Sequence, residues 1–380
     1  MRICLTLIIV SLLLTGCQTA EIRSYSSASD VNSISKEEER LWSAAEHASE
    51  ALVKSDAIYT NEEVTTYVQS VMDRLYPEFR GKIHVRLLNT PYLNAFALPS
   101  GDIYLNVGML SRFENEAQLA TVLAHEGAHF VHKHSLKQNR NAKGATTFAV
   151  GLSIVGIPIV GDLVALSSIF GYSQDLENEA DNVAYERIIK AGYDGREATV
   201  TFEQLAAEVK ALGVDEPFFF ATHPKLQERI SNFNKLNNKG EIGGIKGEQV
   251  FLDNTRDARL FSLSADLSLH RYKSIILNIG KNSEKLAALP EAGFYLGEAY
   301  RLRGNDGDPE KSFKMYQTTL VNAPTFAPTY RALGIYYLKN ENYAESKLML
   351  GRYLELAHDA SDRAIIKQYF KRVSKEVVQP

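Results

Sequence analysis

The pattern with the clearest chemistry is a pair of histidines four residues apart, His125 and His129, with Glu126 directly after the first. On a helix these two positions share one face, so both imidazoles can reach a single divalent cation. Glu126 lies beside them and can take a proton from water activated by that cation. The motif's flanks are uncharged, which favours a buried metal site over a surface helix with two solvated histidines. We therefore predict one Zn²⁺ per chain on this helix.

A catalytic zinc needs a third protein ligand and one open position. The best candidate is Glu177, which begins the run Glu177-Asn178-Glu179-Ala180-Asp181. Glu177 and Asp181 are one helical turn apart, so one carboxylate can bind the metal while the other accepts a hydrogen bond from a ligating imidazole. Glu179 points elsewhere on the helix and is the weaker candidate. The alternative is an acidic helix start that only complements the helix dipole.

Several predicted elements must position these groups. A capping box at Ser35 and Glu38 predicts a helix start. His132 and His134 follow the metal motif on what we expect to be one long helix, so we predict surface roles for both. The expected helices are 35–54, 61–77, 114–139, 174–191 and 196–212, with a strand at 82–89 and a β-hairpin at 94–107 around a Pro/Gly turn.

Four motifs in this order resemble the HtpX/BepA family of membrane-associated zinc metallopeptidases, which includes the CAAX prenyl endopeptidases. Besides the two metal motifs, the matching words are Asn94-Ala95-Phe96-Ala97 with Ile103-Tyr104-Leu105, and Thr222-His223-Pro224 with Arg229 following. The match covers roughly residues 40–235, is of the gluzincin type, and is closest to periplasmic BepA-like members with tetratricopeptide repeats. It implies a mostly helical α+β fold: a zincin-like domain with a small sheet, followed by an α-helical solenoid.

The resemblance and the residue chemistry assign further roles. His223 and Arg229 would supply positive charge or N–H donors to the developing oxyanion. The alternative role for His223, which the resemblance to BepA implies, is that of a fourth zinc ligand that holds the enzyme latent. The strand carrying Asn94, Ala95, Phe96 and Ala97 would bind an extended substrate by strand addition.

The N-terminus predicts export. Residues 1–16 form a short apolar signal, and Leu14-Thr15-Gly16-Cys17 is similar to a lipobox, so we predict lipidation at Cys17. The alternatives are an ordinary signal peptide and an uncleaved anchor. Gln18 favours the outer membrane, facing the periplasm. The serine-rich residues 17–34 are expected to be a flexible tether.

The rest of the chain is expected to divide into three parts. Residues 35–238 would form the peptidase domain, 239–250 a glycine-rich linker, and 251–380 a tetratricopeptide-like helical domain in which Gly297 and Gly334 mark successive repeats. The apolar stretch 144–174 is predicted to be a lid over the site; contact with the membrane is the alternative.

Composition narrows the function. The formal net charge of −4 leaves no basic excess for nucleic acid. We expect a periplasmic zinc endopeptidase acting on unfolded or stalled envelope polypeptides, with the helical domain docking on outer-membrane assembly machinery. The competing hypotheses are a chaperone or adaptor with a latent protease site, and a zinc enzyme that does not act on peptides.

Overall fold

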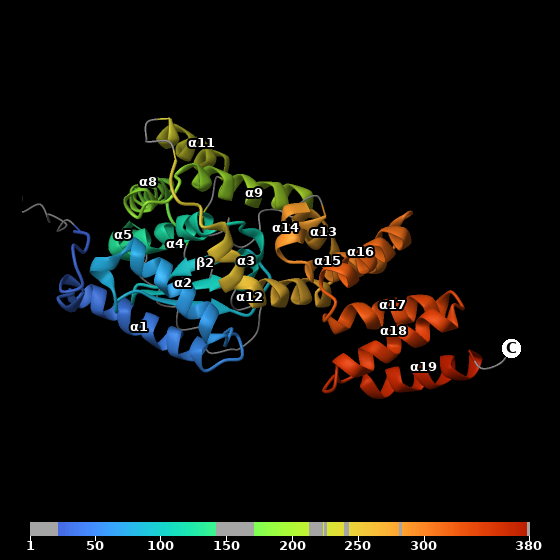
Figure 1. Cartoon of the computed structure of the whole chain (residues 1–380). Helices are drawn as coiled ribbons and strands as arrows, with labels where there is room; N and C mark the ends of the chain where they lie inside the picture. The colour runs from blue at the N-terminus through green and yellow to red at the C-terminus, as the bar shows by residue number, and fades with distance from the viewer. Residues whose placement is uncertain are drawn as a thin grey trace, which may run out of the picture.

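The computed structural model describes residues 22–141, 171–212, 223, 226–238, 243–280 and 283–377 (Figure 1). The signal peptide, Cys17, and residues 144–170 of the apolar stretch lie outside these ranges, as do Thr222 and Pro224 beside His223. The described residues are mostly helical around one small sheet, so the predicted α+β, mostly α fold class is confirmed. None of the helices within these ranges is long and apolar enough to span a membrane.

The sheet has three strands, β1 (His84–Leu88), β2 (Ala95–Ala97) and β3 (Asp102–Asn106), in the order β1-β3-β2. Strand β1 runs parallel to β3, and β2 runs antiparallel to it, which confirms the predicted hairpin. Its turn needs glycine, because Gly101 has φ +95° and a Cβ there would lie 2.3 Å from the Lys82 carbonyl oxygen. Strand β2 is therefore at the edge of the described sheet.

The two N-terminal helices begin where their capping residues predict. Helix α1 (Lys36–Val53) opens with a complete capping box between Ser35 and Glu38, and helix α2 (Glu62–Leu75) is capped by the Asn61 side chain. A short helix that was not predicted, α3 (Val107–Arg112), follows β3 directly.

The prediction of one helix over 114–139 was wrong. Helix α4 (Glu116–Val131) is buried along its whole length, and the separate helix α5 (His134–Asn141) starts after a break. The break is at Lys133, which has φ 55°, a left-handed conformation that interrupts the helix. Tertiary contacts stabilise it: the Lys133 ammonium lies 2.6 Å from a Glu38 carboxylate oxygen and 4.1 Å from the centre of the Tyr25 ring.

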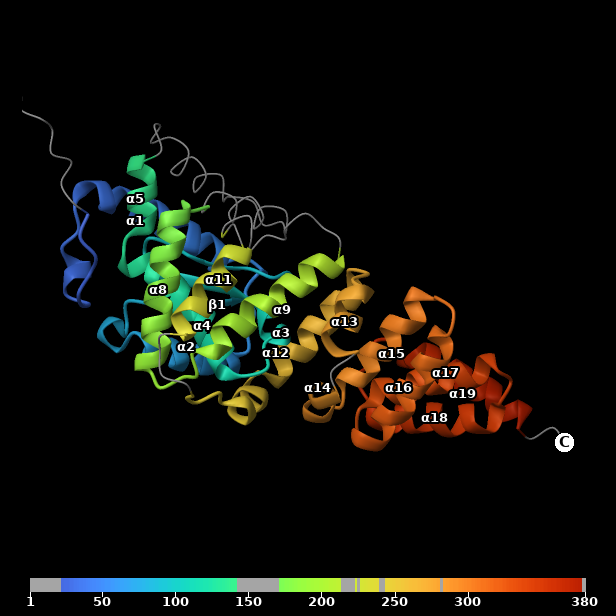
Figure 2. The same ribbon diagram turned by 90° about the horizontal axis from the view of Figure 1, so that it is seen from above.

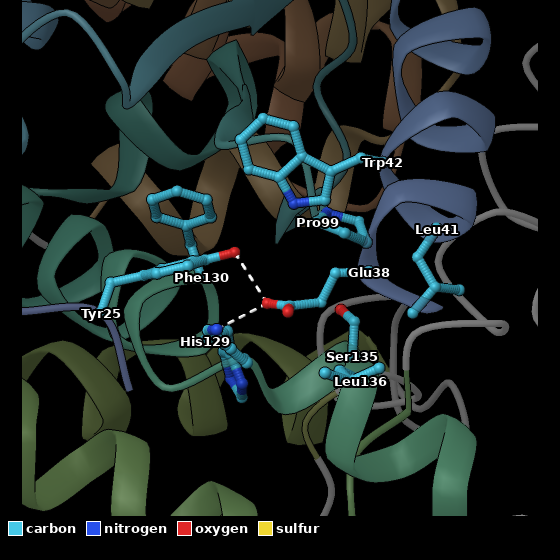
Figure 3. A pocket seen from close by; sticks show the side chains of 10 residues that line it. Tyr25, Glu38, Leu41, Trp42, Pro99, His129, Phe130, Ser135 and Leu136 are labelled. Atoms are coloured by element: carbon cyan, nitrogen blue, oxygen red, sulfur yellow. Dashed lines mark hydrogen bonds and ion pairs between the residues drawn. The ribbon is translucent and has the colours of Figure 1, made fainter. Parts of the chain in front are cut away.

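The expected flexible tether is wrong for its described part, residues 22–34. Tyr25 and Val31 are buried, and the Tyr25 backbone N–H donates to the Val131 carbonyl (2.9 Å) at the end of α4. Figure 3 shows the Tyr25 hydroxyl and the Glu38 carboxylate turned toward each other, 3.1 Å apart. This segment thus holds the junction between α4 and α5 in place.

Three helices complete the part that surrounds α4. Helices α8 (Gln174–Lys190) and α9 (Arg196–Leu212) agree with the predicted spans, and α11 (Leu226–Asn237) follows. Helix α8 packs on α4, and α11 packs on both α8 and α9. The rings of Phe202 on α9 and Phe233 on α11 stack with centroids 5.3 Å apart.

The C-terminal half is helical, as expected, and lies to one side of the sheet and α4 (Figures 1 and 2). Its last helices pack as antiparallel neighbours at glycine contacts: a Cβ on Gly297 would lie 2.6 Å from the Tyr316 ring, and one on Gly334 2.4 Å from Leu350. The helices are α12 (Glu248–Ser268), α13 (Tyr272–Ile279), α14 (Ser283–Ala288), α15 (Ala292–Arg303), α16 (Asp308–Asn322), α17 (Ala327–Lys339), α18 (Tyr343–Leu356) and α19 (Arg363–Glu376).

The junction between the two halves is packed. In the described part of the glycine-rich segment, the Ile245 N–H donates to the Gly192 carbonyl (2.9 Å) and its carbonyl accepts from the Asp194 N–H (3.1 Å). Helix α12 then contacts α2, α3 and α4 as well as α13 and α15. The segment around Ile245 and helices α12 and α13 therefore join the C-terminal helices to the sheet-containing part.

Candidate metal centre

The structure brings the predicted ligands together. On α4, the Nε2 atoms of His125 and His129 lie 2.9 Å apart. Glu177, on α8, places its carboxylate oxygens 3.4 Å from His125 Nε2 and 3.6 Å from His129 Nε2. With His223 they form a group whose potential ligand atoms all lie within 4.8 Å of one another, and all four side chains are buried.

Local sequence explains why α4 and α8 present these groups. Gly127 allows close packing within the motif, because a Cβ there would lie 2.3 Å from the Tyr76 ring, whose hydroxyl donates to the Ala124 carbonyl (2.5 Å). On α8, Glu177 and Asp181 lie on the buried face, one turn apart, as predicted. Both helices are therefore fixed by packing independent of any ligand.

The electrostatics favour the protonation states that a cation requires. Burial and the neighbouring His125 imidazole hold the pKa of His129 well below its usual value, so this ring stays neutral. Burial alone would raise the pKa of Glu177, but His223 and His125 outweigh it and lower the pKa well below the ordinary value. Neutral imidazoles and ionised carboxylates are the forms that bind metals.

Glu126 and His223 face the same space. His223 Nδ1 lies 3.0 Å from Glu177 and 3.2 Å from His125 Nε2, while its Nε2 lies 3.3 Å from Glu126 Oε1. Burial lowers the pKa of His223, but attraction to Glu177 and Glu126 outweighs it and raises the pKa to about 9. A proton on His223 and a metal cation would compete for the same carboxylates.

Asp181 and Arg229 lie behind His125. The Asp181 Oδ1 atom is 2.9 Å from His125 Nδ1 and 2.6 Å from the Arg229 guanidinium, which lies over the Phe202 ring at 4.1 Å. Sequence reasoning expected Arg229 at the oxyanion. The structure shows its guanidinium engaged by Asp181 and also close to the ligand group. One guanidinium nitrogen lies 3.0 Å from His125 Nδ1 and 3.3 Å from its Nε2, and another lies 3.8 Å from a Glu177 carboxylate oxygen.

Two neighbours of His129, His134 and Tyr172, were missed or misjudged from sequence. His134 was expected on a helix surface, yet it is fully buried with its Nδ1 2.8 Å from His129 Nδ1. The Tyr172 ring stacks on His129 at 4.0 Å and 13°. Glu179 contacts His132 and His134 and forms an ion pair with Lys137. The helix break at Lys133 turns His134 back toward His129. Predicting this break would have been needed to place His134 beside His129.

The predicted substrate strand borders this region. Asn94, Ala95, Phe96 and Ala97 are buried, and β2 packs on α4 while its partner strand β3 takes one of its two edges. Any recognition by β2 would therefore use its backbone rather than these side chains.

The donor set fits a divalent cation. Three carboxylates, of Glu126, Glu177 and Asp181, face one guanidinium, that of Arg229, within the buried group. With His223 protonated, as its raised pKa indicates, this leaves an excess of one negative charge. With His223 neutral, the form that binds metals, the excess is two, which a divalent cation would balance. Two imidazole nitrogens and one carboxylate are a zinc ligand set that keeps a position open.

Comparison with known proteins supports the same chemistry. Residues 59–237 match the model of peptidase family M48. The chain is 34% identical over 153 residues to the mitochondrial metalloendopeptidase OMA1 of Arabidopsis thaliana, covering 38% of this chain and 30% of that protein. For OMA1 of Schizosaccharomyces pombe the identity is 30% over 175 residues, with coverage of 44% and 51%.

A third relative is the beta-barrel assembly-enhancing protease of Escherichia coli K12, 24% identical over 216 residues, with coverage of 52% of this chain and 44% of that protein. The matches thus span about a third to a half of the curated relatives' own lengths. The resemblance recognised from the motifs is confirmed for the segment that carries the metal centre, since residues 59–237 match the model of peptidase family M48.

Proposed function

We propose that this protein is a zinc metalloendopeptidase. The observation that carries the proposal is the convergence of His125, His129 and Glu177 from two separate helices, with Glu126 facing the same buried space. The relatives named as metalloendopeptidases and proteases support the peptide-bond assignment. A zinc enzyme acting on another bond would share the ligands and lack that similarity.

The side chains divide the work as follows. His125, His129 and Glu177 would hold the ion, which supplies a Lewis acid that polarises the scissile carbonyl and acidifies water. Glu126 takes the proton of the attacking water on a carboxylate oxygen and returns it to the leaving nitrogen. An extended substrate would add, through backbone hydrogen bonds, to the edge of β2 that the described strands leave unpaired, which selects extended chains with little regard for sequence.

His223 and Arg229 have separate roles in this proposal. His223 is close enough to the ligand set to fill the fourth position, which supports a latent state in which substrate must displace it. If His223→Ala lowers activity at unchanged zinc affinity, His223 assists the oxyanion and latency is wrong. Arg229 is a positioning residue, because its guanidinium fixes Asp181 against His125.

The proposed location and partners in the cell are inferred from the N-terminal signal and the C-terminal helices. Lipidation at Cys17 would anchor the protein to the outer membrane on the periplasmic side, and the helices after residue 251 would recruit clients or dock on assembly machinery as tetratricopeptide-like repeats. The name of the Escherichia coli relative supports quality control of outer-membrane proteins. A chaperone or adaptor with a latent protease site remains the second candidate, supported by the position of His223.

The test is Glu126→Gln in the zinc-loaded full chain, assayed on an unfolded protein such as casein. Loss of the general base should lower kcat/KM by about 10²- to 10⁴-fold while zinc content is unchanged. Equal cleavage by the variant and the wild type would contradict the assignment. If the variant still promoted outer-membrane protein assembly in cells, the chaperone role would operate without proteolysis.

A further inference from the structure

The two ligand histidines differ in what lies behind them. His125 turns Nε2 toward the ligand group, and its Nδ1 meets the Asp181 carboxylate directly at 2.9 Å. His129 also turns Nε2 toward the group, but its Nδ1 meets a second imidazole, that of His134, at 2.8 Å. The group behind His129 is therefore a second imidazole, and what orients that imidazole must be sought in a further residue.

Counting protons on these rings fixes the direction of the contact. A bond between two imidazole nitrogens needs one hydrogen, and a His129 ring that gives its Nε2 lone pair to a metal carries its hydrogen on Nδ1. His129 must then donate to His134 Nδ1, so the hydrogen of His134 is on Nε2. That atom lies 3.3 Å from Glu179 Oε2.

Glu179 is itself held by a cation. The Lys137 ammonium lies 3.0 Å and 3.1 Å from its two carboxylate oxygens. This matches the other side of the centre, where Arg229 holds Asp181. Although His132, His134 and Glu179 are close enough to bind a metal themselves, the Lys137 ammonium already supplies the positive charge there.

We propose that His134 and Glu179 are positioning residues for the zinc site, forming an outer arm that orients His129 as Asp181 orients His125. The inference rests on the proposed zinc function. The arm exists because α4 breaks at Lys133, where Glu38 and Tyr25 hold the left-handed turn that brings His134 beneath His129. Tyr172 stacks on the face of the His129 ring and also restrains its orientation.

The experiment measures zinc affinity of the full chain by competition with a chromophoric chelator. His134→Phe should weaken zinc binding about 10- to 100-fold, the range for loss of an outer partner of a ligating histidine. His134→Asn should recover part of this loss, because its amide oxygen can accept from His129. His132→Gln is the matched control: it contacts Glu179 but not His129, and should stay within about twofold of the wild type.

A second pair tests Glu179, which is partly exposed and tolerates change more easily. Glu179→Leu should weaken zinc binding, and Glu179→Gln, which keeps an acceptor for His134, should retain most of it. At saturating zinc, His134→Phe should lower kcat with KM nearly unchanged, and the cobalt-substituted protein should show an altered visible spectrum. Melting of the zinc-free variants reports separately on folding.

The outcomes separate the two proposals. If the wild type binds zinc and both His134→Phe and Glu179→Leu bind it equally well, the outer arm is wrong and the zinc site stands. If the affinity falls as expected but no peptide is cleaved, the arm stands and the peptidase assignment fails. A wild-type chain without zinc affinity would overturn both.

Discussion

Two buried charged clusters in this chain balance their charges in different ways. In the interface cluster, Arg112 on α3 binds Glu208 on α9 (2.8 Å) and Asp266 on α12 (3.1 Å). Arg271 also binds Asp266 (2.8 Å), so two guanidiniums face two carboxylates. The metal-centre cluster, formed by Glu126, Glu177, Asp181 and Arg229 around the histidines, has three carboxylates for one guanidinium.

The difference separates a structural cluster from a functional one. Burial raises the pKa of Glu208, but its contacts with Arg112 outweigh this and lower it. Burial also raises the pKa of Asp266, and there Arg112 and Arg271 do not outweigh it. The interface cluster nevertheless holds as many guanidiniums as carboxylates. In the metal-centre cluster, even with a proton on His223, the three carboxylates exceed the positive charges by one. The first should therefore be independent of added cations, and the second should require one.

The largest effect is expected in the interface cluster. Arg112→Met leaves Glu208 and Asp266 buried with less compensation, and should lower the free energy of unfolding by about 3–5 kcal/mol. Guanidinium denaturation of the zinc-loaded chain measures it. The double variant Arg112→Met/Glu208→Gln should be less destabilised than Arg112→Met alone. If Arg112→Met lowers the free energy of unfolding by less than about 1 kcal/mol, this cluster does not join the two parts of the chain.

Removal of zinc comes next and should act on the metal centre alone. Free zinc at a hundredfold excess over its Kd stabilises the folded chain by about 2.7 kcal/mol, so chelation should lower the melting temperature. Arg112→Met should keep this response, whereas His129→Ala should lose it. A chelator response equal in wild type and His129→Ala would place the bound ion elsewhere.

The smallest effect concerns the partner of His125. Asp181→Asn keeps the size of the side chain and weakens its interaction with both His125 and Arg229, so zinc affinity should fall about 10- to 100-fold. The measurement is chelator competition, with melting of the zinc-free protein as the control for folding. Unchanged affinity would mean that Asp181 serves the fold rather than the ligand.

The ligand set could be predicted because its spacing is local. His125 and His129, and then Glu177 and Asp181, are pairs one turn apart on helices whose periodicity is plain in the sequence. The capping box at Ser35 and the hairpin turn at Gly101 are equally local signals, and both were placed correctly.

What the sequence did not reveal depends on contacts between distant segments. The break at Lys133 is stabilised by Glu38 and Tyr25, about a hundred residues earlier, so helical periodicity ran through it and put His134 on a surface. The pairing of Arg229 with Asp181 depends on how α11 packs on α8, which no local pattern reveals, and its oxyanion role stays a prediction. At Lys133, tertiary packing overrode a local signal.

The most direct test is diffraction from the purified full chain at the zinc absorption edge. We predict one anomalous peak, about 2.0–2.2 Å from the Nε2 atoms of His125 and His129 and from a Glu177 oxygen. A map without a peak there, or with its peak between His132, His134 and Glu179, would contradict it.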